Sequence, residues 1–93
     1  MTTKLKEQYI ENFLVTCVHH AGGETRKVRW IGRRGAPDRL VMLPHRTVWV
    51  ELKAPGKKAK PYQAREHAVM RRYGLDVVVI DSLDAIEELV KCT

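Results

Sequence analysis

Residues 35–55, GAPDRLVMLPHRTVWVELKAP, are the part of the sequence that decides the fold. Two short runs within them, 38–43 and 47–52, are rich in valine, leucine and other residues that favour strands, and Pro44-His45 separates the two runs. A strand, a turn and a second strand of this length predict a β-hairpin.

Asp38, Glu51 and Lys53 put charge into this hairpin, although a chain of 93 residues buries only a modest core and interior charges are costly. A two-residue turn would place Asp38 opposite Glu51, whereas a four-residue loop over 44–47 would place it opposite Lys53. Proline cannot adopt the positive φ of the favoured two-residue turns, so the longer loop is expected. In either register the three side chains share one face, because side chains alternate along a strand.

Cross-strand carboxylates of this kind repel each other unless a cation neutralises them. Mg²⁺ and Mn²⁺ suit such a pair, because they prefer oxygen ligands and keep places for water and substrate oxygens. A neighbouring lysine can orient or deprotonate an attacking water, or stabilise developing negative charge. The simpler alternative is a solvated ion pair on an exposed sheet surface. Trp49 argues against that alternative, because it shares the face of Glu51, while Val48 and Val50 form the opposite, apolar face.

The rest of the chain alternates between helical and strand patterns. The expected elements are a helix over 3–20, a strand over 24–31, a helix over 61–73, a valine-rich strand over 76–80 and a helix over 83–91. Thr2 or Thr3 is expected to cap the first helix and Ser82 the last. With the hairpin, the predicted order is αβββαβα, in one α/β domain that spans residues 1–93.

Charge and composition narrow the class of protein. The net charge is +6, which favours a polyanionic partner such as nucleic acid, and 44% apolar residues suffice for a folded core. Cys17 and Cys92 lack metal-ligand spacing and are expected to be reduced thiols. No apolar run reaches the roughly 18 residues of a membrane span, and the N-terminal residues lack the apolar core of a signal peptide. An intracellular protein with no membrane partner is therefore expected.

The motif residues resemble a known family. Pro37-Asp38 followed by Glu51-Leu52-Lys53 matches the PD-(D/E)xK nuclease motif, which is weak by itself. The surrounding words GGETRK, GRRGAPDRLVMLP and VWVELKAPGKKAKPYQ resemble the VRR-NUC family, the virus-type replication-repair nuclease domain. This resemblance implies a minimal restriction-endonuclease-like core, with a mixed central sheet flanked by helices. Standalone members are typical of phages and bacteria, which implies the cytoplasm of a bacterium or of a phage-infected host.

The resemblance also assigns roles to individual residues. Asp38 and Glu51 match the metal-binding carboxylates, for Mg²⁺ or Mn²⁺, and Lys53 matches the catalytic lysine. Gln63 matches the family glutamine, which would help orient Lys53 or the attacking water. His67 lies one turn later on the same helical face.

The family further implies a glutamate of the first helix at the site, and two residues compete for that place. Glu7 and Glu11 are both on the predicted helix over 3–20. Glu7 is nearer to the apolar face centred on Ile10 and Cys17, so we expect Glu7 to be the catalytic and metal-binding residue.

Basic residues on both sides of the motif indicate where DNA would bind. The candidates are Arg33, Arg34, Lys57, Lys58 and Lys60. Contacts from such residues to phosphates position DNA without reading its sequence.

A chain this short leaves no room for a sequence-recognition domain, so a structure-selective DNA endonuclease is expected. The resemblance points to branched DNA, such as four-way (Holliday) junctions, and to DNA repair. Symmetrical cutting of two strands would need two active sites, hence a homodimer. The alternatives are a non-catalytic DNA-binding module that kept the nuclease fold, a nuclease acting on flaps or other DNA, and a protein directed at RNA.

Overall fold

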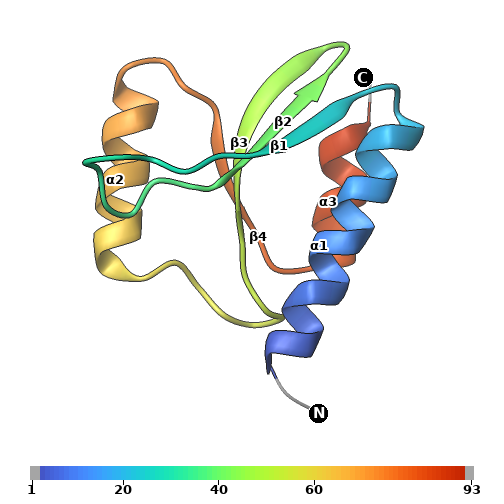
Figure 1. Ribbon diagram of the computed structural model, residues 1–93, viewed down its shortest axis with the longest axis horizontal. Coiled ribbons are helices and arrows are strands. Elements are labelled where there is room, and N and C mark those ends of the chain that lie inside the picture. Colours follow the sequence, from blue (N-terminus) through green and yellow to red (C-terminus); the bar gives the residue numbers. More distant parts are fainter. Residues whose placement is uncertain (1–2, 92–93) are drawn as a thin grey trace.

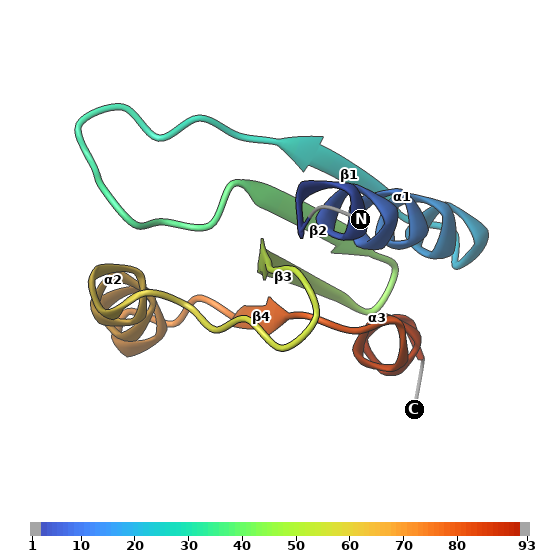
Figure 2. The ribbon, with the colours of Figure 1, turned by 90° about the horizontal axis from the view of Figure 1, so that it is seen from below.

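A four-stranded mixed sheet forms the centre of the computed structural model, with α1 and α3 on one side and α2 on the other (Figures 1 and 2). The structure describes residues 3–91, and side chains within 7–91. The elements are α1 (Thr3–His20), β1 (Glu24–Lys27), β2 (Arg39–Leu43), β3 (Arg46–Leu52), α2 (Pro61–Arg72), β4 (Val77–Ile80) and α3 (Leu83–Val90). The predicted order αβββαβα is therefore confirmed.

The strands lie in the order β1-β2-β3-β4. The pairs β1–β2 and β2–β3 are antiparallel, while β3 and β4 are parallel and joined through α2. Such a parallel pair needs a crossover connection, and α2 with its flanking loops provides it.

The turn of the hairpin differs from the expectation. Leu43 pairs with Arg46, so the connection is the two-residue turn Pro44-His45, and the expected four-residue loop is wrong. No non-glycine residue among those described has a positive φ, so the turn does not use the conformation that proline forbids. The side chain of Arg46 binds Asp76, with Nη2 2.5 Å from Oδ2, which fixes the first residue of β3 beside the start of β4.

The first strand is shorter than expected, because the chain leaves the sheet after Lys27. The indole of Trp30 packs against Trp49, with ring centroids 5.1 Å apart, and its Nε1 donates to the Pro37 carbonyl at 2.8 Å. These contacts direct residues 28–38 into a loop that extends toward α2 (Figure 2).

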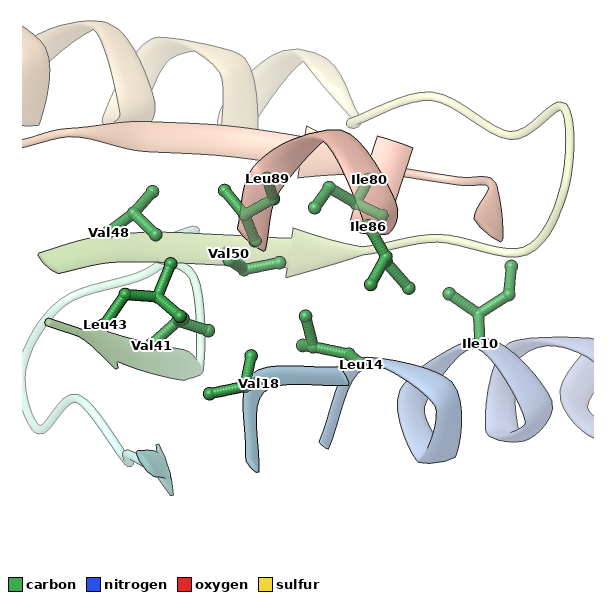
Figure 3. Packing of buried hydrophobic residues seen from close by; sticks show 10 residues of the cluster. All are labelled: Ile10, Leu14, Val18, Val41, Leu43, Val48, Val50, Ile80, Ile86 and Leu89. Atoms are coloured by element: carbon green, nitrogen blue, oxygen red, sulfur yellow. The ribbon is translucent and has the colours of Figure 1, made fainter. Parts of the chain in front are cut away.

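The core lies between the sheet and the α1–α3 layer (Figure 3). It consists of Ile10, Leu14, Val18, Val41, Leu43, Val48, Val50, Ile80, Ile86 and Leu89. The apolar face predicted for the second hairpin strand is thus confirmed, and the opposite face carries Trp49 and Glu51. Asp38, Glu51 and Lys53 therefore lie on the side of α2, away from the core.

The helix ends follow from local sequence. The Ser82 hydroxyl accepts the Ala85 N–H at 3.2 Å, which confirms the predicted cap of α3. Gly22, with φ +84°, follows the end of α1. The proposed caps Thr2 and Thr3 lie outside the described side chains, as does Cys92. Within residues 3–91, no helix is long and apolar enough to cross a membrane.

Candidate active site

The hairpin register brings the motif residues together. Arg39 pairs with Val50, so the next position outward places Asp38 across from Glu51. The Asp38 carbonyl also accepts the Val28 N–H at 2.8 Å, which ties this position to the strand on its other side. Asp38 is exposed, whereas Glu51 and Lys53 are partly buried.

Glu51 is the centre of the site. Its Oε2 lies 3.6 Å from Lys53 Nζ. Burial raises the pKa of Glu51 above its usual value; the nearby Lys53 ammonium opposes this, and the carboxylates of Asp38 and Glu7 add to it. Two neighbouring carboxylates therefore disfavour the charged form of Glu51, and the Lys53 ammonium favours it.

Lys53 is held from its backbone. Its N–H donates to the Ile80 carbonyl at 2.9 Å, which continues the parallel pairing of β3 with β4 beyond the strand end. The backbone from which the Lys53 side chain extends toward Glu51 is therefore held by the sheet rather than by a free loop.

Gln63, in the first turn of α2, contacts Glu51. Its Nε2 donates to Glu51 Oε2 at 3.4 Å, and its Oε1 accepts the Lys60 N–H at 2.8 Å. The amide thus bridges the start of α2 and the carboxylate. The sequence suggested that Gln63 orients Lys53 or a water, and the observed contact adds Glu51 to those candidates.

His67 is a member of the site to which the sequence gave no role. It is only 1% exposed, and its Nε2 lies 3.8 Å from Glu51 Oε1. Burial and the nearby Arg71 lower its pKa, although a hydrogen bond with the Gly35 backbone opposes them. Within the described residues Nε2 has no hydrogen-bond partner. The spacing Gln63 to His67 on one helical face was the only hint in the sequence.

The two glutamates of α1 have different surroundings. The Glu11 carboxylate binds the guanidinium of the buried Arg39 and lies 3.6 Å from Lys27 Nζ. Glu7 is exposed and close enough to Glu51 to raise its pKa. Glu11 already balances an arginine on the core side of the sheet, which supports Glu7 as the glutamate of the site.

The donor set fits a divalent cation in an open site. Within the described residues, no group of three or more Asp, Glu, His or Cys side chains is arranged to hold a metal ion. Mg²⁺ does not need such a group, because it uses one or two carboxylates with waters and substrate oxygens. A cation would relieve the repulsion of Glu51 by Asp38 and Glu7, and a water bound to it could supply the partner that His67 Nε2 lacks.

Two basic clefts lie beside the site. One, of about 420 Å³, is lined by Lys27, Val28, Arg29, Trp30, Arg33, Ala36 and Asp38. The other, of about 320 Å³, is lined by Gly32, Arg33, Arg34, Tyr62, Arg65, Glu66 and Val69. Among these basic residues the sequence singled out Arg33 and Arg34; Lys27, Arg29 and Arg65, which also line the clefts, were not named.

The predicted DNA-binding residues differ in how they are held. Arg33 binds the buried Glu66 through Nε and Nη2, both 2.8 Å from Oε1. The Arg34 guanidinium lies over the Tyr62 ring, 4.1 Å from its centroid. The lysines of the 54–60 loop, Lys57, Lys58 and Lys60, are exposed. The arginines therefore present fixed charges, and the lysines project freely.

An α/β core with paired carboxylates and a lysine on one sheet face is the arrangement of a nuclease, and comparisons with known proteins agree. The chain is 49% identical over 81 residues to "Putative nuclease p44" of Acyrthosiphon pisum secondary endosymbiont phage 1, covering 86% of this chain and 87% of that one. It also matches a solved structure described as a VRR_NUC domain, with a TM-score of 0.82 and 36% identity, over 91% of this chain and 94% of that one. No family model matches the sequence. The chain belongs to the VRR-NUC family of nucleases.

The raised pKa of Glu51 predicts that the stability of the protein depends on pH. Because the pKa of Glu51 is raised in the folded protein, its contribution to stability is present at low pH and is lost as pH rises through that pKa. Glu51→Gln should therefore raise the melting temperature of the metal-free protein at about pH 7.5, with the difference shrinking toward about pH 4.

Addition of Mg²⁺ or Mn²⁺ should then make the melting temperature of the wild type higher than that of Glu51→Gln. Binding at about 100 times the dissociation constant adds about 2.7 kcal/mol to the wild type, and the variant should lose most of that gain. Glu87→Gln, an exposed carboxylate on α3, is the control. A wild type that is as stable as Glu51→Gln without metal at neutral pH would contradict the prediction.

Proposed function

We propose that this nuclease is a Mg²⁺- or Mn²⁺-dependent endonuclease that hydrolyses phosphodiester bonds in DNA, with a preference for branched molecules such as four-way junctions. The observation that carries the proposal is the placement of Asp38 across from Glu51, with Lys53 Nζ 3.6 Å from the Glu51 carboxylate.

Asp38 and Glu51 are the residues that would hold the cation, with Glu7 joining directly or through water. A divalent cation at such a site supplies a lowered pKa for a bound water and charge neutralisation at the phosphate. Lys53 orients the attacking water and offsets the charge that develops on the phosphate oxygens. Gln63 donates a hydrogen bond to the Glu51 carboxylate from the α2 side at 3.4 Å, and His67 Nε2 lies 3.8 Å from the same carboxylate.

The preference for branched DNA is supported by the two basic clefts, one of which includes Asp38. Fixed arginines and projecting lysines contact phosphates, which every DNA sequence offers alike. A homodimer is part of the proposal, because paired cuts in a symmetrical junction need two active sites.

Cleavage of a panel of labelled molecules tests the proposal. Four-way junction, flap, single-stranded and linear duplex DNA, together with an RNA duplex, are incubated with Mg²⁺, Mn²⁺ or a chelator. Metal-dependent cutting that is fastest on the junction is the expected result. Metal-independent binding without any cutting would favour a DNA-binding module. Cutting confined to the RNA would identify RNA, rather than DNA, as the substrate.

The three loop lysines make a separate prediction. Lys57→Ala, Lys58→Ala and Lys60→Ala combined should weaken binding to all DNA forms and reduce the slope of log affinity against log salt by about 2.7, if each lysine contacts one phosphate of a duplex. Fluorescence anisotropy at several salt concentrations measures the slope. Arg72→Ala, an exposed basic residue at the other end of α2, is the control and should leave the slope unchanged. A triple variant with the slope of the wild type would place the DNA elsewhere.

A further inference from the structure

The loop between β1 and β2 carries an almost fully exposed isoleucine at its tip. Ile31 is 93% exposed, the highest value among the large hydrophobic residues described. The next residue, Gly32, has φ +76° and open space where a Cβ would lie. Single exposed apolar residues are common on protein surfaces, so exposure alone assigns no role to Ile31. The contacts that hold the loop on both sides of Ile31 do indicate a role.

The loop is anchored on both sides of this tip. Before it, Trp30 packs on Trp49 and binds the Pro37 carbonyl. After it, Arg33 binds the buried Glu66, and the Arg34 guanidinium covers Tyr62. In Figure 2 the loop is seen to extend beyond the strands on the side of α2. The apolar tip is therefore presented from a fixed base.

A further close contact, between Gly35 and α2, holds the loop. Gly35 has φ +92°, and a Cβ on it would lie 2.9 Å from the Tyr62 carbonyl oxygen. The loop thus packs directly on the first turn of α2, where Gln63 contacts Glu51. The position of the tip is coupled to that of the site.

The tip lies in the sequence between residues that line the two basic clefts. Arg29 and Trp30 line the cleft that contains Asp38, Gly32 and Arg34 line the other, and Arg33 lines both. An apolar side chain with cations on either side matches the surface of bent or branched DNA, where a gap in base stacking lies between two phosphate backbones. Apolar side chains inserted at base steps are a known way in which proteins kink DNA.

We propose that Ile31 is a wedge that enters the base stack of the bound DNA next to the phosphate that is cut, while the two clefts hold the phosphates on either side. Insertion costs unstacking energy, which is smallest where stacking is already interrupted. The wedge would therefore give preference to branch points over continuous duplex without reading sequence. This inference rests on the proposed DNA nuclease function.

Fluorescence of 2-aminopurine tests the wedge. The probe is placed in a base pair beside the branch point of a four-way junction, and binding is measured without divalent metal, so that no cutting occurs. The wild type should raise the fluorescence about threefold or more at saturation, as unstacking does. Ile31→Ser should lose most of that rise, with an affinity within about threefold of the wild type, because phosphate contacts carry the binding.

Matched variants separate the wedge from other effects. Ile31→Leu should restore the rise, and Tyr73→Ser, which alters another exposed side chain at the far end of α2, should leave it unchanged. With metal present, the ratio of junction to duplex cleavage should fall in Ile31→Ser. Circular dichroism verifies that each variant is folded.

Three results would overturn the inference. They are no fluorescence rise with the wild type, an equal rise with Ile31→Ser, or a large loss of affinity with the rise unchanged, which would make Ile31 a simple contact residue. Failure of the nuclease function has a different result, because it leaves the wild type unable to cut with metal whatever the 2-aminopurine signal.

Discussion

Lys53→Ala should reduce the rate of metal-dependent DNA cleavage by about 10²–10³-fold, the usual loss when one group that stabilises transition-state charge is removed. The ammonium lies 3.6 Å from the Glu51 carboxylate, and the sheet holds its backbone through the Ile80 carbonyl. Single-turnover cleavage with enzyme in excess measures the chemical step apart from binding and product release.

The controls for this variant exploit the other lysines. Lys58→Ala removes an exposed lysine of the neighbouring loop and should change affinity far more than the single-turnover rate. Lys53→Ala should keep its DNA affinity and also its metal-induced gain in melting temperature, because the carboxylates remain. A Lys53→Ala protein that cuts at the wild-type rate would make the lysine a mere counter-ion of Glu51.

Leu14→Ala should lower the free energy of unfolding by about 2–5 kcal/mol, the range for truncating a buried leucine. Leu14 is 0% exposed and lies in α1 at the centre of the core. A small domain has only about 5–15 kcal/mol of stability in total, so this variant should be close to unfolding at 37 °C. Urea denaturation followed by circular dichroism gives the difference.

The adjacent position supplies the comparison for this core variant. Val15 is 37% exposed on the same helix, and Val15→Ala should shift the unfolding free energy by no more than about 0.5 kcal/mol. Equal losses for Leu14→Ala and Val15→Ala would contradict the prediction, because alanine has the higher helix propensity at both positions and only the loss of packing distinguishes them.

The sequence alone predicted the faces of the hairpin but not its turn. Alternation along Val48, Trp49 and Val50 separates an apolar face from a charged one whatever the turn, because loops of two and four residues differ by an even number. In the structure Arg46 pairs with Leu43, and its side chain binds Asp76, a contact distant in sequence that no local pattern indicates. The early end of β1 has a similar origin in the packing of Trp30 on Trp49.

The candidate site could be predicted in part for the same reason. Asp38, Glu51 and Lys53 follow from spacing within one hairpin, whereas the choice of Glu7 over Glu11 depends on Arg39, whose side chain lies on the core side and binds Glu11. No sequence pattern indicated that α2 would bury polar residues. The sequence predicted nothing for Glu66 and placed His67 only on the helical face of Gln63, because their partners Arg33 and Glu51 are distant in sequence.

The parallel pairing of β3 with β4 has a consequence for the order of events during synthesis. The hairpin is local and forms early, but the Lys53 N–H binds the Ile80 carbonyl, so the lysine is fixed only after the chain has crossed through α2 and returned. Non-local parallel pairing is slow compared with hairpin formation. When Asp38 and Glu51 have emerged from the ribosome, Lys53 is therefore still not held by its partner in β4. We expect nuclease activity to arise only after the residues up to Ile80 have emerged and β4 has paired with β3.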